Sequence, residues 1–239
     1  MENLNQFLHN SNGDELRLIV VSNRLPVTVS RGSDGEYEFK MSSGGLVSAL
    51  SGCKKQMDFT WIGWLGIEIP KEDREHVSKR LMDEYSCQPV FLPNSIGDKY
   101  YNGFSNEILW PLFHYHPGEM NFDEGNWHAY REANAMFAHV VREQVRPGDM
   151  VWIQDYHLML LPMMLRGLIE RSNFTDETNK ELDKLHKGIS VDVDTNTHRN
   201  FDEKHGVKIG WFLHTPFPSS EIYRSVLLLL QNLVFFIYY

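Results

Sequence analysis

The chain has 239 residues, of which 42% are hydrophobic and 13% aromatic, enough to bury the core of one large domain or of two small ones. Its formal net charge of -9 argues against a nucleic-acid-binding protein, which needs clustered basic residues, but leaves room for a local cationic pocket. Cys53 and Cys87 are too few for a disulfide scaffold, and neither a signal peptide nor a transit peptide opens the sequence, so we expect a cytoplasmic protein.

The first half of the chain alternates strand and helix patterns. Residues 1–15 are polar and are expected to be flexible, and "LRLIVVS" (16–22) is apolar on both faces, as a central parallel strand would be. A turn at residues 33–35 indicates a hairpin. Beyond it we predict strands in "FTWIGWLG" (59–66) and "CQPVFLP" (87–93), and helices in "GGLVSALSGCKK" (44–55) and "KEDREHVSKRLMDEY" (71–85).

The second half repeats this alternation. "NWHAYREANAMFAHVVREQV" (126–145) spaces its apolar residues like an amphipathic helix, Met150–Ile153 indicates a strand followed by a crossover and a helix, and "VKIGWFLHTPFP" (207–218) indicates a strand. Alternating strands and helices predict an α/β fold with a doubly wound, Rossmann-like parallel sheet. Residues 171–206 are polar and without periodicity, so we expect a disordered insertion there. The apolar tail 226–239 is shorter than the ~20 residues that span a bilayer, so no membrane association is predicted.

Polar or aromatic side chains follow four of the predicted strands at the point where each strand ends. They are Ser22–Arg24, Trp64, Asp155–His157, and His214 with Thr215. In a doubly wound sheet, ligands bind at the carboxyl ends of the strands, so we expect these side chains to face one crevice. One such residue alone is often just a helix cap, but four together favour a ligand site.

Arg24 and a glycine pair are the candidates for binding an anion. Arg24 offers a permanent charge and a planar fork of N–H donors suited to phosphate or carboxylate; its ordinary alternative is a surface ion pair. Gly44 and Gly45 stand at the very start of the predicted helix 44–55, where bare backbone N–H groups can approach an anion. The pair matches neither the dinucleotide fingerprint nor the P-loop pattern, which disfavours a dinucleotide-dependent oxidoreductase.

The stretch 99–116 is unusually aromatic and includes Tyr100, Tyr101, Trp110, Phe113 and Tyr115. Phe104 and Phe113 are predicted to be core, whereas tyrosine and tryptophan carry polar groups that need partners and rings that can stack on a sugar. Asp155 fits the same interpretation as an acceptor for sugar hydroxyls, and His157 is expected to be a structural partner. No His, Cys, Asp or Glu cluster has metal-ligand spacing, and we predict neither a metal nor a cofactor.

Six motifs occur in one order along the chain: "VVSNRLPV", "SSGGLVSAL", "WIGWLG", "YYNGFSNEILWPLFHY", "DYHLMLLP" and "GWFLHTPFPSSEI". Together they resemble the N-terminal half of the trehalose-6-phosphate synthase family, most of all its fungal members. The resemblance runs from about Leu18 to Ser225, apart from the polar insertion. Six ordered motifs are far more specific than any single glycine pattern.

The resemblance implies the GT-B architecture, in which two Rossmann-like domains face a cleft and residues 16–225 would form the acceptor-binding domain. It implies transfer of glucose from UDP-glucose to glucose 6-phosphate with retention at the anomeric carbon, giving trehalose 6-phosphate and UDP. No carboxylate nucleophile is then needed, since in that family the departing phosphate accepts the proton of the attacking hydroxyl. Catalysis would depend on orientation and on charge stabilisation at the leaving group.

The same resemblance implies a role for each candidate on the acceptor side. Arg24 and Tyr101 would bind the phosphate end of glucose 6-phosphate, and Trp64 would line that pocket. Asp155 would bind the acceptor hydroxyls.

On the donor side, Gly44 and Gly45 would approach the phosphates of UDP-glucose. His214 would contact the donor glucose near the reacting carbon and is the candidate catalytic residue. Trp110 and Thr215 match positions that the family uses to select the α-anomer of the acceptor.

Part of the family pattern has no match in this sequence. The family continues into a nucleotide-sugar domain where this chain has the atypical tail 226–239, so we expect that domain to be absent and the chain to be inactive alone. The alternative is a non-catalytic subunit that binds glucose 6-phosphate or regulates a trehalose synthase complex. Both readings allow a homo-oligomer or a trehalose synthase/phosphatase complex, and neither involves nucleic acid or a membrane.

Overall fold

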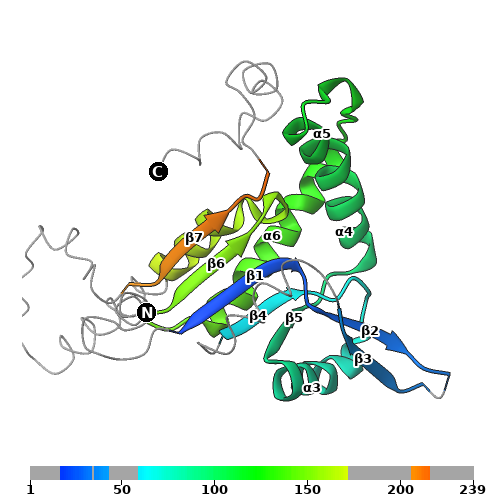
Figure 1. The fold of residues 1–239 in the computed structure, drawn as a ribbon, viewed down its shortest axis with the longest axis vertical. Helices are drawn as coiled ribbons and strands as arrows, with labels where there is room; N and C mark the ends of the chain where they lie inside the picture. The colour runs from blue at the N-terminus through cyan, green and yellow to red at the C-terminus, as the bar shows by residue number, and fades with distance from the viewer. Residues whose placement is uncertain (1–16, 34, 43–58, 172–205, 216–239) are drawn as a thin grey trace, which may run out of the picture.

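The structure, a computed structural model, describes residues 17–33, 35–42, 59–171 and 206–215 (Figure 1). Its centre is a five-stranded parallel sheet in the order β5-β4-β1-β6-β7. The strands are β1 Leu18–Arg24, β4 Phe59–Trp64, β5 Cys87–Val90, β6 Met150–Gln154 and β7 Lys208–Phe212. The predicted α/β fold with a doubly wound parallel sheet is therefore confirmed.

The strand order reverses beside β1. From β1 the chain moves outward through β4 to β5, and it then returns to the other side of β1 to form β6 and β7. In such sheets the ligand crevice opens at the carboxyl ends of the strands where the order reverses. Arg24 ends β1 and Asp155 follows β6, so the topology brings these two predicted site residues to the same crevice.

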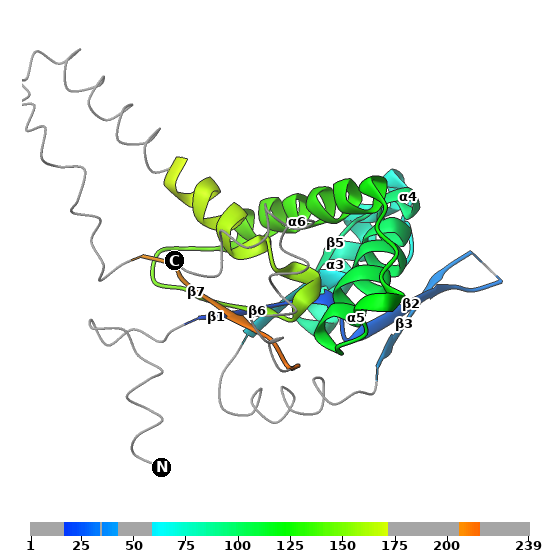
Figure 2. The same ribbon diagram turned by 90° about the horizontal axis from the view of Figure 1, so that it is seen from above.

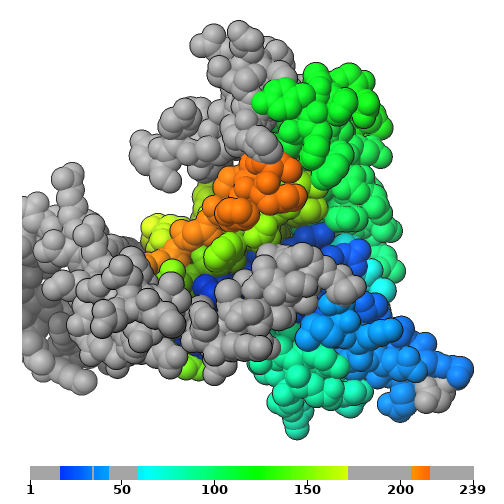
Figure 3. Space-filling view, in the orientation of Figure 1, coloured from blue at the N-terminus to red at the C-terminus, as the bar shows by residue number. Residues whose placement is uncertain are grey.

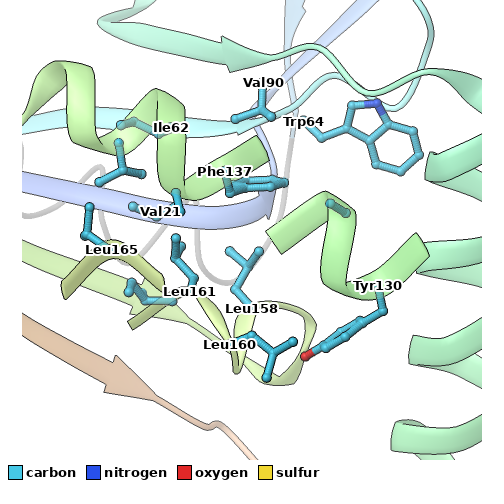
Figure 4. Close-up of a cluster of buried hydrophobic side chains, with 14 of the residues drawn as sticks. Val21, Ile62, Trp64, Val90, Tyr130, Phe137, Leu158, Leu160, Leu161 and Leu165 are labelled. Atoms are coloured by element: carbon cyan, nitrogen blue, oxygen red, sulfur yellow. The ribbon is translucent and has the colours of Figure 1, made fainter. Parts of the chain in front are cut away.

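One face of the sheet is covered by α6 Glu124–Gln144 and by a helix over residues 161–171 (Figure 2). The Asp123 side chain caps α6 by accepting a hydrogen bond from the Asn126 N–H at 2.9 Å. Figure 4 shows Val21 and Ile62 of the sheet in one buried cluster with Phe137 of α6. Each of these three side chains is fully buried, so this layer fixes the helices against the central strands.

The other face is covered over β1, β4 and β5 by α3 Arg74–Tyr85 and by an antiparallel hairpin, β2 Val27–Arg31 with β3 Tyr37–Met41. Leu18 and Val20 of β1 point into this layer, because alternate residues of a strand face opposite sides. Both faces of β1 are thus buried, as predicted for a central parallel strand. Over β6 and β7 the same face exposes apolar side chains, and Figure 3 shows β7 at the surface.

A partly buried ion pair ties three segments together at the amino ends of the strands. Asp149, just before β6, accepts hydrogen bonds from Arg17 Nε at 3.1 Å and from Arg17 Nη2 at 2.6 Å. It also accepts one from the Arg146 N–H at 2.7 Å, in the turn after α6. Arg17 donates further to the Gln144 carbonyl at the end of α6. The start of β1, the end of α6 and the start of β6 are therefore held at one point, opposite the crevice.

The aromatic stretch forms helical structure for which the sequence analysis predicted no element. α4 Asn94–Asp98, the π-helical segment η2 Lys99–Leu109 and α5 Trp110–Phe113 follow one another without a break. π-helical segments are rare in proteins and are frequently found at functional sites. Phe104 and Phe113 are buried as predicted.

Several predictions of the sequence analysis concern residues outside the described part of the chain. These are the helix at 44–55, the interior of the insertion and the tail 226–239, so the domain layout stays a prediction. Of the predicted insertion 171–206, the structure describes only the two ends: Arg171 is the last residue of the preceding helix, and Gly206 precedes β7. Within the described residues, no helix is both long enough and apolar enough to cross a membrane.

Candidate functional site

Arg24 enters the crevice from an irregular end of β1. The pairing of β1 with β4 shifts register between Val21 and Arg24. The Ser22 hydroxyl donates a hydrogen bond to the Arg24 carbonyl at 2.7 Å and accepts one from Trp61 Nε1 at 2.6 Å. These bonds fix the backbone from which the Arg24 side chain extends.

The Arg24 guanidinium lies over two aromatic rings. Its Cζ atom is 4.2 Å from the ring centroid of Trp64 and 5.5 Å from that of Tyr101. Partial burial lowers the pKa of Arg24, but a guanidinium stays charged at neutral pH. No carboxylate in the described part of the chain pairs with Arg24. The described residues therefore do not support the alternative interpretation of Arg24 as one half of a surface ion pair. Because Arg24 ends β1 at the edge of the sheet where the crevice opens, its charged N–H donors form a candidate site for an anion.

Asp155 follows β6 in a conformation that non-glycine residues rarely adopt, with φ 74° and ψ 172°. The neighbouring β7 holds it there: the Asp155 N–H donates to the Phe212 carbonyl at 2.7 Å, and Trp211 Nε1 donates to the Asp155 carbonyl at 2.9 Å. Backbone strain of this kind is concentrated at functional sites, because it persists only where surrounding contacts enforce it. β7 therefore fixes the direction of the Asp155 side chain.

The Asp155 carboxylate has two partners. One oxygen accepts a hydrogen bond from the Tyr156 N–H at 2.9 Å, and the other lies 2.7 Å from His214 Nδ1. Burial raises the pKa of the Asp155 carboxyl, and the bonds from Tyr156 and His214 oppose that shift. The side chain of His214 is 52% exposed, so this pair stands at the open side of the crevice.

His157 connects the Arg24 side of the site to the Asp155 side through ring stacking. Its imidazole stacks on Tyr101 at 5.5 Å between centroids and on Tyr156 at 4.2 Å. Burial lowers the pKa of His157 to about 4, with the nearby charges of His214 and Arg24 adding to the shift. The ring is therefore neutral at neutral pH, and the structural role predicted for it agrees with its position.

Two residues of α6 hold the loop that carries Asp155 and His157. The Tyr130 hydroxyl donates to the Tyr156 carbonyl at 2.7 Å and accepts from the Met159 N–H at 3.2 Å, and Asn134 Nδ2 donates to the His157 carbonyl at 3.1 Å. Sequence reasoning missed both. The available signal was an asparagine on the apolar face of an amphipathic helix, one turn from a tyrosine, since buried amides and hydroxyls need partners.

The lowered pKa of His157 predicts a stability that falls with acidity. Between pH 6.5 and about 4 the unfolded chain gains a proton on His157 that the folded chain does not, so the free energy of unfolding falls as pH falls through this range. We expect a loss of about 2 to 3 kcal/mol from about pH 7 to about pH 4.5, measured by urea denaturation. The raised pKa of Asp155 acts in the opposite direction.

The matched variant is His157→Phe, which keeps a ring between Tyr101 and Tyr156 but cannot titrate. It should lose less stability than the wild-type chain over the same pH range, by about the same 2 to 3 kcal/mol. Equal slopes for the two proteins would show that His157 is not the group responsible.

Of the other predicted site residues, Trp110 and Thr215 belong to the part of the chain that the structure describes. Trp110 is 46% exposed and its ring lies 6.4 Å from Tyr156, at the same end of the sheet. The Thr215 hydroxyl is buried and has no hydrogen-bond partner among the described residues. Gly44 and Gly45 lie outside the described residues. The structure thus gathers six of the nine candidates through ring contacts and hydrogen bonds: Arg24, Trp64, Tyr101, Trp110, Asp155 and His214.

The arrangement suits a ligand that combines an anion with hydroxyl groups. Arg24 offers charged N–H donors, Asp155 offers a carboxylate acceptor, and the exposed ring of Trp110 offers an apolar face. A phosphorylated sugar has all three complementary features. In the described ranges no three His, Cys, Asp or Glu side chains come together as a metal site.

Known proteins resemble this chain in sequence and in fold. Residues 16–228 match glycosyltransferase family 20. The chain is 52% identical over 217 residues to an Aspergillus fumigatus protein named alpha,alpha-trehalose-phosphate synthase (UDP-forming) 1, with 91% of this chain and 36% of that protein covered. A solved alpha,alpha-trehalose-phosphate synthase (UDP-forming) from Burkholderia vietnamiensis gives a TM-score of 0.58 at 28% identity, over 92% of this chain and 37% of that one.

A second solved structure carries a different name. It is the N-terminal domain of Candida albicans trehalose-6-phosphate phosphatase, with a TM-score of 0.58 at 26% identity over 87% of this chain and 36% of that chain. The matched residues therefore cover 36% of the Aspergillus protein, 37% of the Burkholderia chain and 36% of the Candida chain, little more than a third of each.

Proposed function

Because the chain belongs to glycosyltransferase family 20, we propose that it forms the acceptor side of a glucosyltransferase that makes trehalose 6-phosphate and UDP from UDP-glucose and glucose 6-phosphate. The fold agrees with this membership, since solved synthases superpose on it as the Rossmann-like N-terminal domain of a GT-B glycosyltransferase. The observation that carries the proposal is the Arg24 guanidinium, which lies over Trp64 and Tyr101 at the end of β1 and has no carboxylate partner among the described residues.

On the acceptor side, Arg24 binds the phosphate of glucose 6-phosphate. The stack on Trp64 and Tyr101 supports this role, because it holds the planar fork in one direction and occupies no N–H donor with a carboxylate. Asp155 accepts hydrogen bonds from the sugar hydroxyls, and its pairing with His214 opposes the rise in the carboxyl pKa that burial causes. Trp110 and Thr215 set the preference for the α-anomer.

On the donor side, His214 contacts the glucose being transferred, near its anomeric carbon, and the backbone of Gly44 and Gly45 approaches the UDP phosphates. The reaction retains the anomeric configuration: the bond to the UDP phosphate breaks as the acceptor hydroxyl attacks on the same face, and the departing phosphate takes the hydroxyl proton. The residues act by orientation and by charge stabilisation. The position of His214 beside Asp155 supports this, because it places the donor contact next to the acceptor hydroxyls.

These residues match only part of the length of the known synthases, and this affects what they can do alone. They match about a third of the synthase length, and a complete reaction needs both sides of the cleft. We therefore propose that the 239 residues alone bind glucose 6-phosphate without turnover. A non-catalytic role in a synthase or phosphatase complex is the second candidate, supported by the same fold in the phosphatase N-terminal domain.

Titration calorimetry of the 239-residue chain with glucose 6-phosphate tests the acceptor role. We expect saturable heat with glucose 6-phosphate and at least tenfold weaker binding of glucose, which lacks the charged group that Arg24 recognises; about 1.4 kcal/mol corresponds to that factor. No binding of glucose 6-phosphate would refute the acceptor role. Release of UDP by these residues alone would refute the lack of turnover, and capture of a full-length synthase in a pull-down would favour the second candidate.

A further inference from the structure

Gly66 lies directly against the Arg24 guanidinium. It follows the end of β4, two residues after Trp64, and has φ +83°, in the region that favours glycine. A Cβ atom at this position would overlap the Arg24 guanidinium, both at Nη1 and at Cζ. The guanidinium therefore occupies the space that any other residue at position 66 would fill with its side chain.

The indole under Arg24 is also fixed. Trp64 is 3% exposed, and a Cβ atom added at Gly97 would lie 2.5 Å from Trp64 Cζ2, so the ring is in contact with the backbone of α4. The ring of Tyr100 packs against it at 6.4 Å between centroids. If a side chain at position 66 pushed Arg24 away, Trp64 could not shift with it, because Gly97 and Tyr100 hold the indole in place.

We propose that Gly66 is a positioning residue for the acceptor phosphate: its missing side chain is the space that lets Arg24 lie on Trp64 with its N–H groups turned to the crevice. The inference rests on the proposed function for the identity of the anion, but the position of Arg24 is independent of any ligand. Position 66 favours glycine for two reasons: its positive φ angle, and the Arg24 guanidinium that lies where a side chain would be. Only the second reason concerns the site.

Gly66→Ala separates binding from folding because the atoms that it displaces are the far end of a flexible side chain. Arg24 can rotate away into solvent, so the fold tolerates the methyl group while the fork leaves Trp64 and Tyr101. Gly148→Ala is the matched control: Gly148 has φ +90°, so it shares the backbone cost, but a Cβ atom there meets nothing within 4 Å.

The first experiment needs no ligand. In the full 239-residue chain, the Arg24 Nε–H signal in NMR, assigned by its loss in Arg24→Lys, should be shifted upfield by the ring current of Trp64. We expect this shift to disappear in Gly66→Ala and to persist in Gly148→Ala. An unchanged Arg24 signal in Gly66→Ala would overturn the proposal, whatever the chain binds.

The second experiment measures the consequence for the ligand by a double-mutant cycle. Gly66→Ala should weaken glucose 6-phosphate binding by at least about tenfold and leave glucose binding unchanged, because only the phosphate depends on the fork. In the Arg24→Ala background, Gly66→Ala should have no further effect on glucose 6-phosphate. Additive losses, or equal losses for glucose and glucose 6-phosphate, would show a general structural effect and overturn the proposal. If the wild-type chain fails to bind glucose 6-phosphate while the NMR result holds, the proposed function and the phosphate assignment fail, but not the positioning of Arg24.

Discussion

Arg24→Ala is expected to weaken the binding of glucose 6-phosphate by about 100-fold, because the loss of two charged hydrogen bonds of about 1.5 kcal/mol each corresponds to that factor. The fold should survive, since the guanidinium lies at the crevice and has no described ion-pair partner to leave behind. Titration calorimetry measures the loss, and circular dichroism confirms that the variant is folded.

Two variants define what the loss means. Arg24→Lys keeps the charge but loses the planar fork and its stack on Trp64, so it should bind with intermediate affinity. Arg31→Ala removes the same charge from β2, where Arg31 donates to the Gly35 carbonyl away from the crevice, and should bind like the wild-type chain. Unchanged binding of glucose 6-phosphate in Arg24→Ala would show that Arg24 has no role in binding this ligand.

Asp149→Ala is expected to lower the free energy of unfolding by about 3 kcal/mol, at the low end of the range for breaking a buried ion pair because Arg17 is partly exposed. The Asp149 side chain is 6% exposed and accepts three hydrogen bonds from two segments of the chain, so its removal leaves the donors of Arg17 and Arg146 without this acceptor. Urea denaturation measures the change, and the thermal midpoint should fall by about 10 °C.

A surface pair in the same chain provides the control. Arg80 and Glu84 pair at 3.0 Å one turn apart on α3 with both side chains at least 36% exposed, so Glu84→Ala should cost less than about 0.5 kcal/mol. Asp149 lies at the amino ends of the strands, so folded Asp149→Ala should bind glucose 6-phosphate like the wild-type chain. Equal losses of stability for the two variants, or a weakened affinity in Asp149→Ala, would contradict this account.

The residues that the sequence identified are those whose chemistry stands out locally. Arg24 and Asp155 are polar or charged residues directly after apolar strands, and that contrast is visible without a structure. The aromatic stretch also held a signal that was not used: Tyr100, Phe104 and Ile108 are four residues apart, and all three are fully buried on one side of a helical segment. The glycine and asparagines between them argue against a regular α-helix, and the segment is in fact π-helical.

The features that the sequence did not reveal depend on neighbours that are distant along the chain. Gly66 matters because Arg24, 42 positions earlier, fills the space beside it, and no pattern around Gly66 reveals this. His157 has a lowered pKa because burial and the charges of Arg24 and His214 meet at its ring. Tyr130 matters because its hydroxyl reaches the backbone of Tyr156, on another element.

The sequence by itself determined the alternation of strands and helices, the central position of β1 and the polar residues at the strand ends, because burial periodicity and residue chemistry are local properties. Only the tertiary structure decided that β6 pairs with β1, which brings Asp155 to the crevice of Arg24, and that Trp64, Tyr101 and Gly66 surround one guanidinium. Strand order and side-chain volume arise from contacts between distant segments, and the free energy of such contacts depends on the whole packed chain.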